Sequence, residues 1–170
     1  MEIGEGCWRF LPFGSTMGAS WREEGLMPAT AEIVEVLGGA EPGRRRVNSP
    51  EELKEWIREG LPFASLESVM ERFGLNREEI SSALDLPPRT LARRKQERRL
   101  HRDESDRLFR LVRIASQASE VLGGEGKAGR WLHTPNRALG GQPPLELLDT
   151  DLGSRQVEEV LGRIEYGVYS

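Results

Sequence analysis

The sequence predicts an all-α fold, and three observations lead to this class. Apolar residues recur at spacings of three and four along most of the chain after residue 28. Ser-Pro and Asn-x-x-Glu start signals and glycine stop signals bound these periodic segments. No segment shows the alternation of a half-buried strand. With 37% hydrophobic and 31% charged residues, the 170-residue chain fits a soluble globular protein.

Residues 1–28 are expected to be a disordered or artefactual N-terminal extension. They follow no steady period, and Met17 and Met27 offer alternative starts. A short docking arm is the competing interpretation, because the segment carries Trp8, Phe10, Phe13 and Trp21. The single cysteine, Cys7, excludes an internal disulfide, which fits a cytoplasmic protein. No run of 18 apolar residues predicts a membrane span, so we expect no membrane association.

Residues 29–122 are expected to form a first domain. A short helix over residues 29–37 ends at Gly38-Gly39, because glycine readily takes the left-handed conformation that stops a helix. The Pro- and Gly-containing stretch that follows predicts an exposed loop. In that loop, Arg44–Arg46 are interpreted as solvated charge, with a phosphate contact as the alternative.

The next helix has a clear start. Ser49 can accept a hydrogen bond at its N-cap, Pro50 suits the first turn, and Glu52 completes a capping box. Gly60 ends it. Its apolar face consists of Leu53, Trp56 and Ile57, and we assign Trp56 to the core rather than to a binding surface.

Two further helices follow. The first begins after Pro62, ends at Gly74, and carries Leu66, Val69, Met70 and Phe73 on one face. The second covers residues 76–84, where Asn76 and Glu79 form another capping box.

A break at residues 85–87 and a helix over residues 88–99 complete the spacing of a helix-turn-helix. The turn of this motif usually carries glycine, and here Asp85 stands in its place. Aspartate tolerates the left-handed region better than most residues, so we expect the turn to form.

A long helix is expected over residues 103–122, with Asp103 and Asp106 as capping residues. One side is apolar and contains Leu108, Leu111, Val112, Ala115, Ala118 and Leu122. About twenty residues give a helix of roughly 30 Å, which either spans the core or pairs with a second copy. We expect this helix and its neighbours to form a homodimer.

Residues 123–170 are expected to form a small second domain of short helices and tight turns. Trp131 is assigned to its core, and Asn136 to a cap of the following turn. Pro143-Pro144 begins a helical turn, and a final amphipathic helix carries Val157, Val160, Leu161 and Ile164.

Positive charge is concentrated in one segment. The chain as a whole has a net charge of −4, yet residues 89–102 contain seven cations against one acid, Glu97. As the second helix of a helix-turn-helix, this segment would enter the major groove of DNA. The predicted DNA-binding residues are Arg89, Thr90 and Arg93 toward the bases and Arg94, Lys95 and Arg98 toward phosphates. Two alternatives stay open: a merely solvated helix, or arginines paired with an acidic partner or with the chain's own acidic face.

The sequence supports neither catalysis nor a cofactor. Its two histidines, His101 and His133, lie in unrelated segments and have no nearby cysteine. No zinc-ligand spacing and no phosphate-binding glycine loop occur. We therefore expect no catalytic residues, no metal, no small-molecule substrate, and a protein that acts by binding.

From about Val34 to Ser170 the chain resembles the Xre/ParS/MbcA-type antitoxins of bacterial type II toxin–antitoxin systems. The resemblance is carried by "VLGG" at 36–39, "REGLP" at 58–62, "RTLARRK" at 89–95, "DESDRL" at 103–108, "WLHTPNRALGGQPPLELLDTDLG" at 131–153 and "VEEVLGRIEYGVYS" at 157–170. It implies an Xre-like helix-turn-helix domain followed by a small helical toxin-binding domain. It also implies a dimeric antitoxin whose partner is a RES-domain toxin that consumes NAD. Antitoxins of this family often repress their own operon by binding operator DNA.

The last residues suggest how neutralisation works. Glu165, Tyr166, Val168, Tyr169 and Ser170 follow or end the final helix and combine aromatic area with negative charge. A pocket for NAD must hold a diphosphate, which arginines bind well. We therefore expect this tail to enter the toxin's active site, with a frayed terminus as the alternative. The alternative, from another functional class, is a stand-alone transcriptional regulator without a toxin partner.

Overall fold

The computed structural model describes residues 30–39 and 47–167, and within them the chain is helical. The elements are α1 (Thr30–Val36), α2 (Pro50–Glu59), α3 (Phe63–Phe73), α4 (Arg77–Ala83), α5 (Pro88–Glu97), α6 (Arg102–Leu122), α7 (Glu125–His133), η1 (Arg137–Leu139), η2 (Pro144–Asp149) and α8 (Asp151–Glu165). The described part of the chain contains no strand, so the all-α prediction is confirmed. The predictions for residues 1–28 and for Arg44–Arg46 lie outside the described residues.

The capping residues seen in the sequence lie where the structure begins the corresponding helices. The Ser49 hydroxyl accepts a hydrogen bond from the Glu52 amide at 3.2 Å, although the Glu52 carboxylate accepts from Asn48 rather than from Ser49. Asn76 and Glu79 form the reciprocal capping box of α4, with distances of 2.9 and 2.7 Å. These local hydrogen bonds need no tertiary partner, which is why the sequence reveals them.

The start of α6 differs from the prediction. The helix begins at Arg102, and the Glu104 carboxylate accepts from the His101 amide at 2.7 Å. Asp103 is exposed, and Asp106 instead pairs with Arg110 one turn later. Neither aspartate caps the helix, because Glu104 already occupies the position that reaches back to the N-cap.

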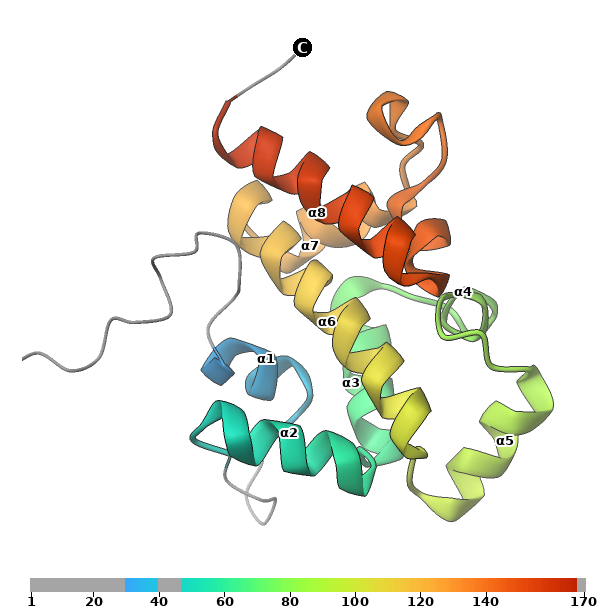
Figure 1. The fold of residues 1–170 in the computed structure, drawn as a ribbon. Coiled ribbons are helices and arrows are strands. Elements are labelled where there is room, and N and C mark those ends of the chain that lie inside the picture. Colours follow the sequence, from blue (N-terminus) through green and yellow to red (C-terminus); the bar gives the residue numbers. More distant parts are fainter. Residues whose placement is uncertain (1–29, 40–46, 168–170) are drawn as a thin grey trace, which may run out of the picture.

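Helix α6 spans the core. Figure 1 shows it running through the middle of the molecule, and it packs against α1, α2, α3, α7, α8 and η2. Its buried apolar residues are Leu108, Leu111, Val112, Ile114, Ala115 and Ala118. This apolar face is covered within the chain, so it is not free to pair with a second copy. A homodimer that uses the neighbouring helices stays a prediction.

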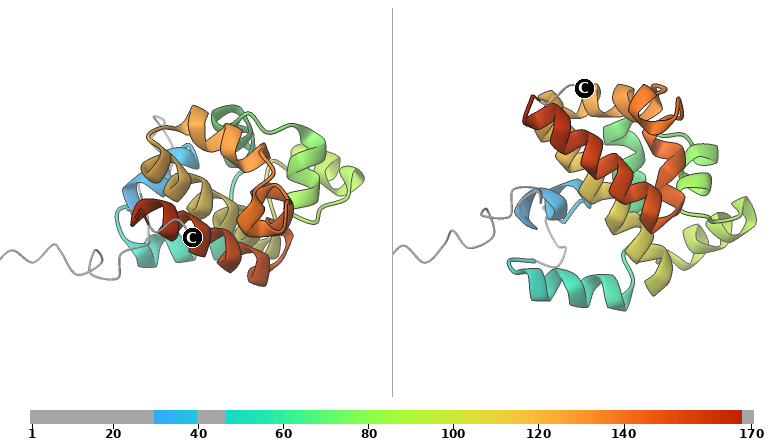
Figure 2. Two further views of the ribbon diagram at one scale, coloured as in Figure 1. Left: turned by 90° about the horizontal axis from the view of Figure 1, so that it is seen from above. Right: turned by 45° about the horizontal axis from the view of Figure 1, so that its top comes forward.

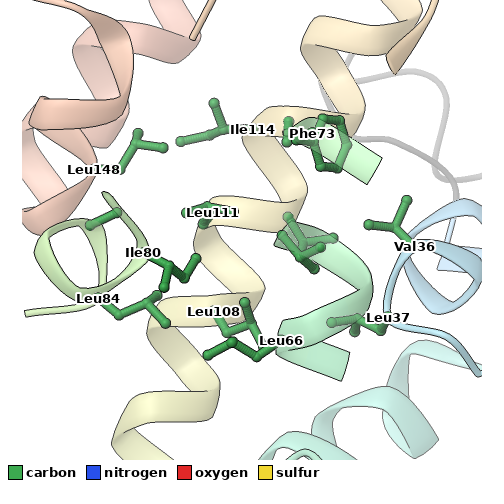
Figure 3. Close-up of a cluster of buried hydrophobic side chains, with 14 of the residues drawn as sticks. Val36, Leu37, Leu66, Phe73, Ile80, Leu84, Leu108, Leu111, Ile114 and Leu148 are labelled. Atoms are coloured by element: carbon green, nitrogen blue, oxygen red, sulfur yellow. The ribbon is translucent and has the colours of Figure 1, made fainter. Parts of the chain in front are cut away.

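One hydrophobic cluster connects both halves of the chain. In Figure 3, Leu108, Leu111 and Ile114 of α6 lie among side chains from α1, α3, α4 and η2. Trp56 is 4% exposed and belongs to this core as predicted, while Trp131 is partly buried and packs against it. The two other views show α7 and α8 lying along α6 (Figure 2). None of the helices in the described residues is long and apolar enough to cross a bilayer.

Candidate nucleic-acid and partner interfaces

The turn before α5 is fixed by the body of the protein. Asp85 adopts φ 47°, the left-handed conformation that the sequence analysis expected at this position. The Arg107 guanidinium of α6 donates to the carbonyl oxygens of Leu84 at 2.8 Å and Asp85 at 3.2 Å. Leu86 and Leu91 are buried, so they anchor the turn and the first half of α5. A long-range arginine thus satisfies carbonyls that the end of α4 leaves free.

The other end of α5 is attached to the α2–α3 connection. The Phe63 amide donates to the Arg98 carbonyl at 3.0 Å, and the Leu100 amide donates to the Leu61 carbonyl at 2.9 Å. Arg98 adopts φ 58°, which ends α5 after Glu97 instead of after residue 99 as predicted. The two ends hold α5 where Figure 1 shows it, projecting beside α4 at the edge of the molecule.

Arg94 points into the protein, so the prediction that it contacts DNA phosphates is wrong. The residue is 3% exposed. Its Nε donates to both Glu104 oxygens at 2.8 and 2.7 Å, and Nη1 donates to Glu97 at 2.6 Å. Nη2 lies 2.9 Å from Nδ1 of His101. Buried guanidinium groups require such partners because an unpaired buried charge is very unfavourable.

The Arg94–Glu104 pair changes the ionisation of both groups. Burial alone would raise the pKa of the Glu104 carboxyl, but the hydrogen bonds from Arg94 and from the His101 amide outweigh it, so the pKa lies below its usual value. The hydrogen bond with Glu104 raises the pKa of the Arg94 guanidinium. Both groups therefore stay charged at neutral pH and lock α5 to the start of α6.

Several remaining cations of this segment also have acidic partners. Arg93 lies 3.9 Å from Glu97, Lys95 lies 3.1 Å from Glu67, and Arg99 lies 3.9 Å from Glu59. These pairs are exposed and therefore weak, so a phosphate can replace the carboxylate at little cost. The alternative in which the arginines meet the chain's own acids is thus correct for part of the cluster.

The outward face of α5 remains available to a partner. Arg89, Ala92, Arg93 and Gln96 recur at helical spacing and are exposed, whereas Thr90 is half-buried. Arg89 and Arg98 are exposed and form no ion pair with the described residues. Gln96 escaped the sequence analysis, although it shares a face with Arg89 and Arg93 at the spacing of an exposed stripe.

The C-terminal end of the described chain is exposed. Glu165 is the last residue of α8, and Tyr166 follows it with 65% of its surface exposed. The Tyr166 amide donates to the Gly162 carbonyl at 3.0 Å, so the backbone is still tied to the helix here. The predicted toxin-binding residues Val168, Tyr169 and Ser170 lie outside the described residues.

A pocket of about 370 Å³ lies between η1 and α8. Its lining residues are Ala138, Leu139, Gly140, Gln142, Gln156, Glu159, Val160 and Arg163. Asn136 caps η1 through a hydrogen bond from the Ala138 amide at 2.9 Å, as predicted. No pattern in the sequence predicts this pocket, because its two walls meet only through the fold. In the described part of the chain, no group of three or more His, Cys, Asp or Glu side chains is placed to hold a metal ion.

Comparison with known proteins identifies both halves. Residues 52–113 match the antitoxin Xre-like helix-turn-helix domain, and residues 117–167 match the antitoxin Xre/MbcA/ParS C-terminal toxin-binding domain. An Antitoxin Xre of Yersinia enterocolitica is 33% identical over 154 residues, which are 89% of this chain and 91% of the relative. This chain belongs to the Xre/MbcA/ParS antitoxin family.

Two further relatives are similar to this Xre-family antitoxin. An Antitoxin Xre of Pseudomonas putida is 45% identical over 83 residues, which are 48% of this chain and 52% of the relative. A chain in the crystal structure of the Mycobacterium tuberculosis MbcT–MbcA toxin–antitoxin complex superposes with a TM-score of 0.51. That chain is 28% identical, and the match covers 64% of the Xre-family antitoxin and 96% of the solved chain.

The two candidate surfaces of the antitoxin fall into different family matches. Helix α5 lies inside the helix-turn-helix match, while the η1–α8 pocket and Tyr166 lie inside the toxin-binding match. The two matches meet within α6, at residues 113–117. The helix-turn-helix match and the toxin-binding match therefore share one helix, whose apolar face is buried.

Proposed function

We propose that this antitoxin neutralises a RES-domain toxin that consumes NAD, and that its C-terminal end blocks the toxin's active site. The observation that carries the proposal is the match of residues 117–167 to a toxin-binding domain. The similarity to a chain of the MbcT–MbcA complex supports it further. The antitoxin itself acts by binding and performs no chemistry.

The geometry of the C-terminal end suits insertion into a cavity. Helix α8 is fixed to the core through Val157 and Leu161, and it carries Glu165 and Tyr166 out into solvent. A rigid support lowers the entropy lost on docking. The negative charge of this end, to which the Glu165 carboxylate contributes, then meets the arginines that hold the diphosphate of NAD, and its aromatic area covers the nucleotide surface.

Removal of residues 166–170 tests this role. The truncated antitoxin should keep its fold, because Tyr166 is exposed and the core ends within α8. With a RES-domain toxin from the neighbouring reading frame, the full chain should stop NAD loss and the truncated chain should not. Full protection of NAD by the truncated antitoxin would disprove the proposal that the C-terminal end blocks the toxin's active site.

We further propose that a dimer of the antitoxin represses its own operon. Two copies of α5 related by a two-fold axis suit a palindromic operator, and Arg89, Arg93 and Gln96 present donors to base edges. Arg98 and Lys95 are placed for phosphates. Light scattering at working concentration tests the dimer, and a monomeric mass would contradict it.

Binding to the promoter duplex tests the groove assignment. Changing Arg89 and Arg93 to Ala should weaken binding at least tenfold and reduce its salt dependence, because counterion release drives the association. Lys54→Ala on α2 serves as the control. Unchanged duplex affinity in the double variant would contradict the assignment.

A stand-alone regulator without a toxin remains the alternative function. The cationic face of α5 is the feature that favours it. Residues 117–167 argue against it, because reading DNA requires none of them. Failure of the wild-type chain to co-purify with the product of the neighbouring gene, together with specific duplex binding, would favour the regulator.

A further inference from the structure

The described part of the chain exposes two large hydrophobic side chains, one near the start of α8 and one directly after its end. Leu152 is 70% exposed at the start of the helix, and Tyr166 is 65% exposed at its end. Single exposed apolar residues are common and need no explanation. Here, however, the two residues are fourteen positions apart, which returns to nearly the same helical face after four turns.

The positions between them continue the same face. Leu152, Gln156, Glu159, Arg163 and Tyr166 follow the spacing of one helical stripe, and all five are exposed. We call this set the α8 ridge. At 1.5 Å per residue, its two apolar ends lie roughly 21 Å apart. The opposite face of the helix is buried through Val157 and Leu161, so the ridge points away from the core.

The ridge borders the η1–α8 pocket. Gln156, Glu159 and Arg163 belong to both, and Arg163 donates to Glu159 on the same helix. This ion pair is exposed, so both groups can re-pair with a partner at little energetic cost. The ridge also contains Tyr166 and Arg163, and tyrosine and arginine are enriched among the residues that contribute most to protein–protein binding.

We propose that the α8 ridge and its pocket form a docking surface for the toxin, in addition to the tail of residues 167–170 that enters the active site. This inference rests on the proposed function, since it assigns a second contact to the same partner. Two observations select the toxin as the occupant. The ridge lies wholly within the segment matched to a toxin-binding domain, and its Tyr166 end leads directly into the tail.

The partner surface follows from this chemistry. The toxin presents two apolar hollows about 21 Å apart, with hydrogen-bonding and charged groups between them that meet Gln156 and Arg163. Docking along the ridge fixes the direction of α8 and so delivers the tail to the cavity. Binding strength and inhibition should therefore separate, with the ridge controlling the first and the tail the second.

The test compares three variants of the full antitoxin against the same RES-domain toxin. Leu152→Glu removes one anchor, and because Leu152 is the second residue of α8, an acid there also suits the helix N-terminus. Arg163→Ala removes the central cation. Deletion of residues 167–170 removes the tail and leaves Tyr166, the second anchor of the ridge, in place. Lys54→Ala on α2 is the matched control, since it changes the net charge by the same amount at an exposed position outside the ridge.

Dissociation constants from calorimetry and rates of NAD loss are the two readouts. We expect Leu152→Glu to weaken binding at least tenfold and Arg163→Ala several-fold, with Lys54→Ala unchanged. The deletion should lose inhibition while it keeps most of the binding. Circular dichroism confirms that each variant is folded.

The outcomes distinguish the two proposals. If both ridge variants bind as tightly as wild type, the ridge is not the docking surface, whereas neutralisation by the tail stands. If wild type itself binds no toxin, the proposed function fails and the ridge assignment fails with it.

Discussion

Arg94 shows how far a residue's surroundings determine its role. In the sequence it is one of seven cations within residues 89–102, and in the structure it is 3% exposed and bound to Glu104. Glu104 lies ten positions later, beyond the reach of any helical spacing rule. The charge pattern predicted a cationic helix correctly, but it gave no means of separating the buried arginine from its exposed neighbours.

Replacing Arg94 should therefore affect stability rather than DNA binding alone. Arg94→Met leaves the Glu104 carboxylate buried without its partner, which costs about 3–5 kcal/mol. Arg89→Ala, at an exposed position on the same helix, should change the free energy of unfolding by less than about 0.5 kcal/mol. Urea denaturation of both variants checks this, and equal midpoints would contradict the structural role of Arg94.

Glu32 of α1 leads to a pH prediction at the same scale. Burial raises the pKa of this carboxyl to about 7, together with a hydrogen bond to Glu120 and the charges of Glu120, Glu35 and Glu125. The pKa in the folded state lies above the ordinary value of 4.5, so the folded protein binds the extra proton. The associated stability is complete below pH 4.5 and disappears as the pH rises through 7.

Glu32→Gln should remove this dependence, because the amide cannot ionise. The melting temperature of wild type should fall between pH 5 and pH 8 by more than that of the variant. Arg72, which pairs with Glu35 at 3.3 Å and Glu125 at 2.7 Å, stays charged throughout. Parallel melting curves of the two proteins across this range would rule out the assignment.

At the scale of elements, the sequence predicts which segments form helices, but it does not predict which helices contact one another. The apolar spacing and the caps predicted α2, α3, α4 and α8 because both are local properties of the chain. The end of α5 was predicted two residues too late, because the backbone bridge from residues 98–100 to 61–63 forces the chain out of the helix. A pairing between segments nearly 40 positions apart leaves no local signal.

The two glycines inside α7 illustrate the same distinction. A Cβ at Gly129 would lie 2.5 Å from the Phe73 carbonyl oxygen of α3, whereas Gly126 faces open space. Gly129→Ala should therefore destabilise the protein by about 1–3 kcal/mol. Gly126→Ala should be neutral or stabilise it by up to about 1 kcal/mol through helix propensity. Thermal unfolding of the pair measures the difference, and equal effects would refute the close packing of α7 on α3.

For the whole molecule, the central position of α6 predicts one cooperative unfolding transition. Leu108 near its start and Ala118 near its end are both fully buried in the same cluster. The two family matches meet within this helix, so neither the helix-turn-helix part nor the toxin-binding part contains a complete hydrophobic core. Calorimetry should show a single peak, and a fragment ending at Gly123 should fail to fold. Two separate transitions would show that the halves are independent.

By itself the sequence determined the helical class, most helix limits, the cationic segment and the family, since each depends on local spacing or on a long linear pattern. The fold alone decided which charges face solvent, because burial depends on what packs against a side chain. It buried Arg94, left Arg89 exposed, and packed the apolar face of α6 against its own neighbours. It also aligned Leu152 and Tyr166 on the outside of α8, where only the packing of the opposite face against the core determines which stripe remains exposed.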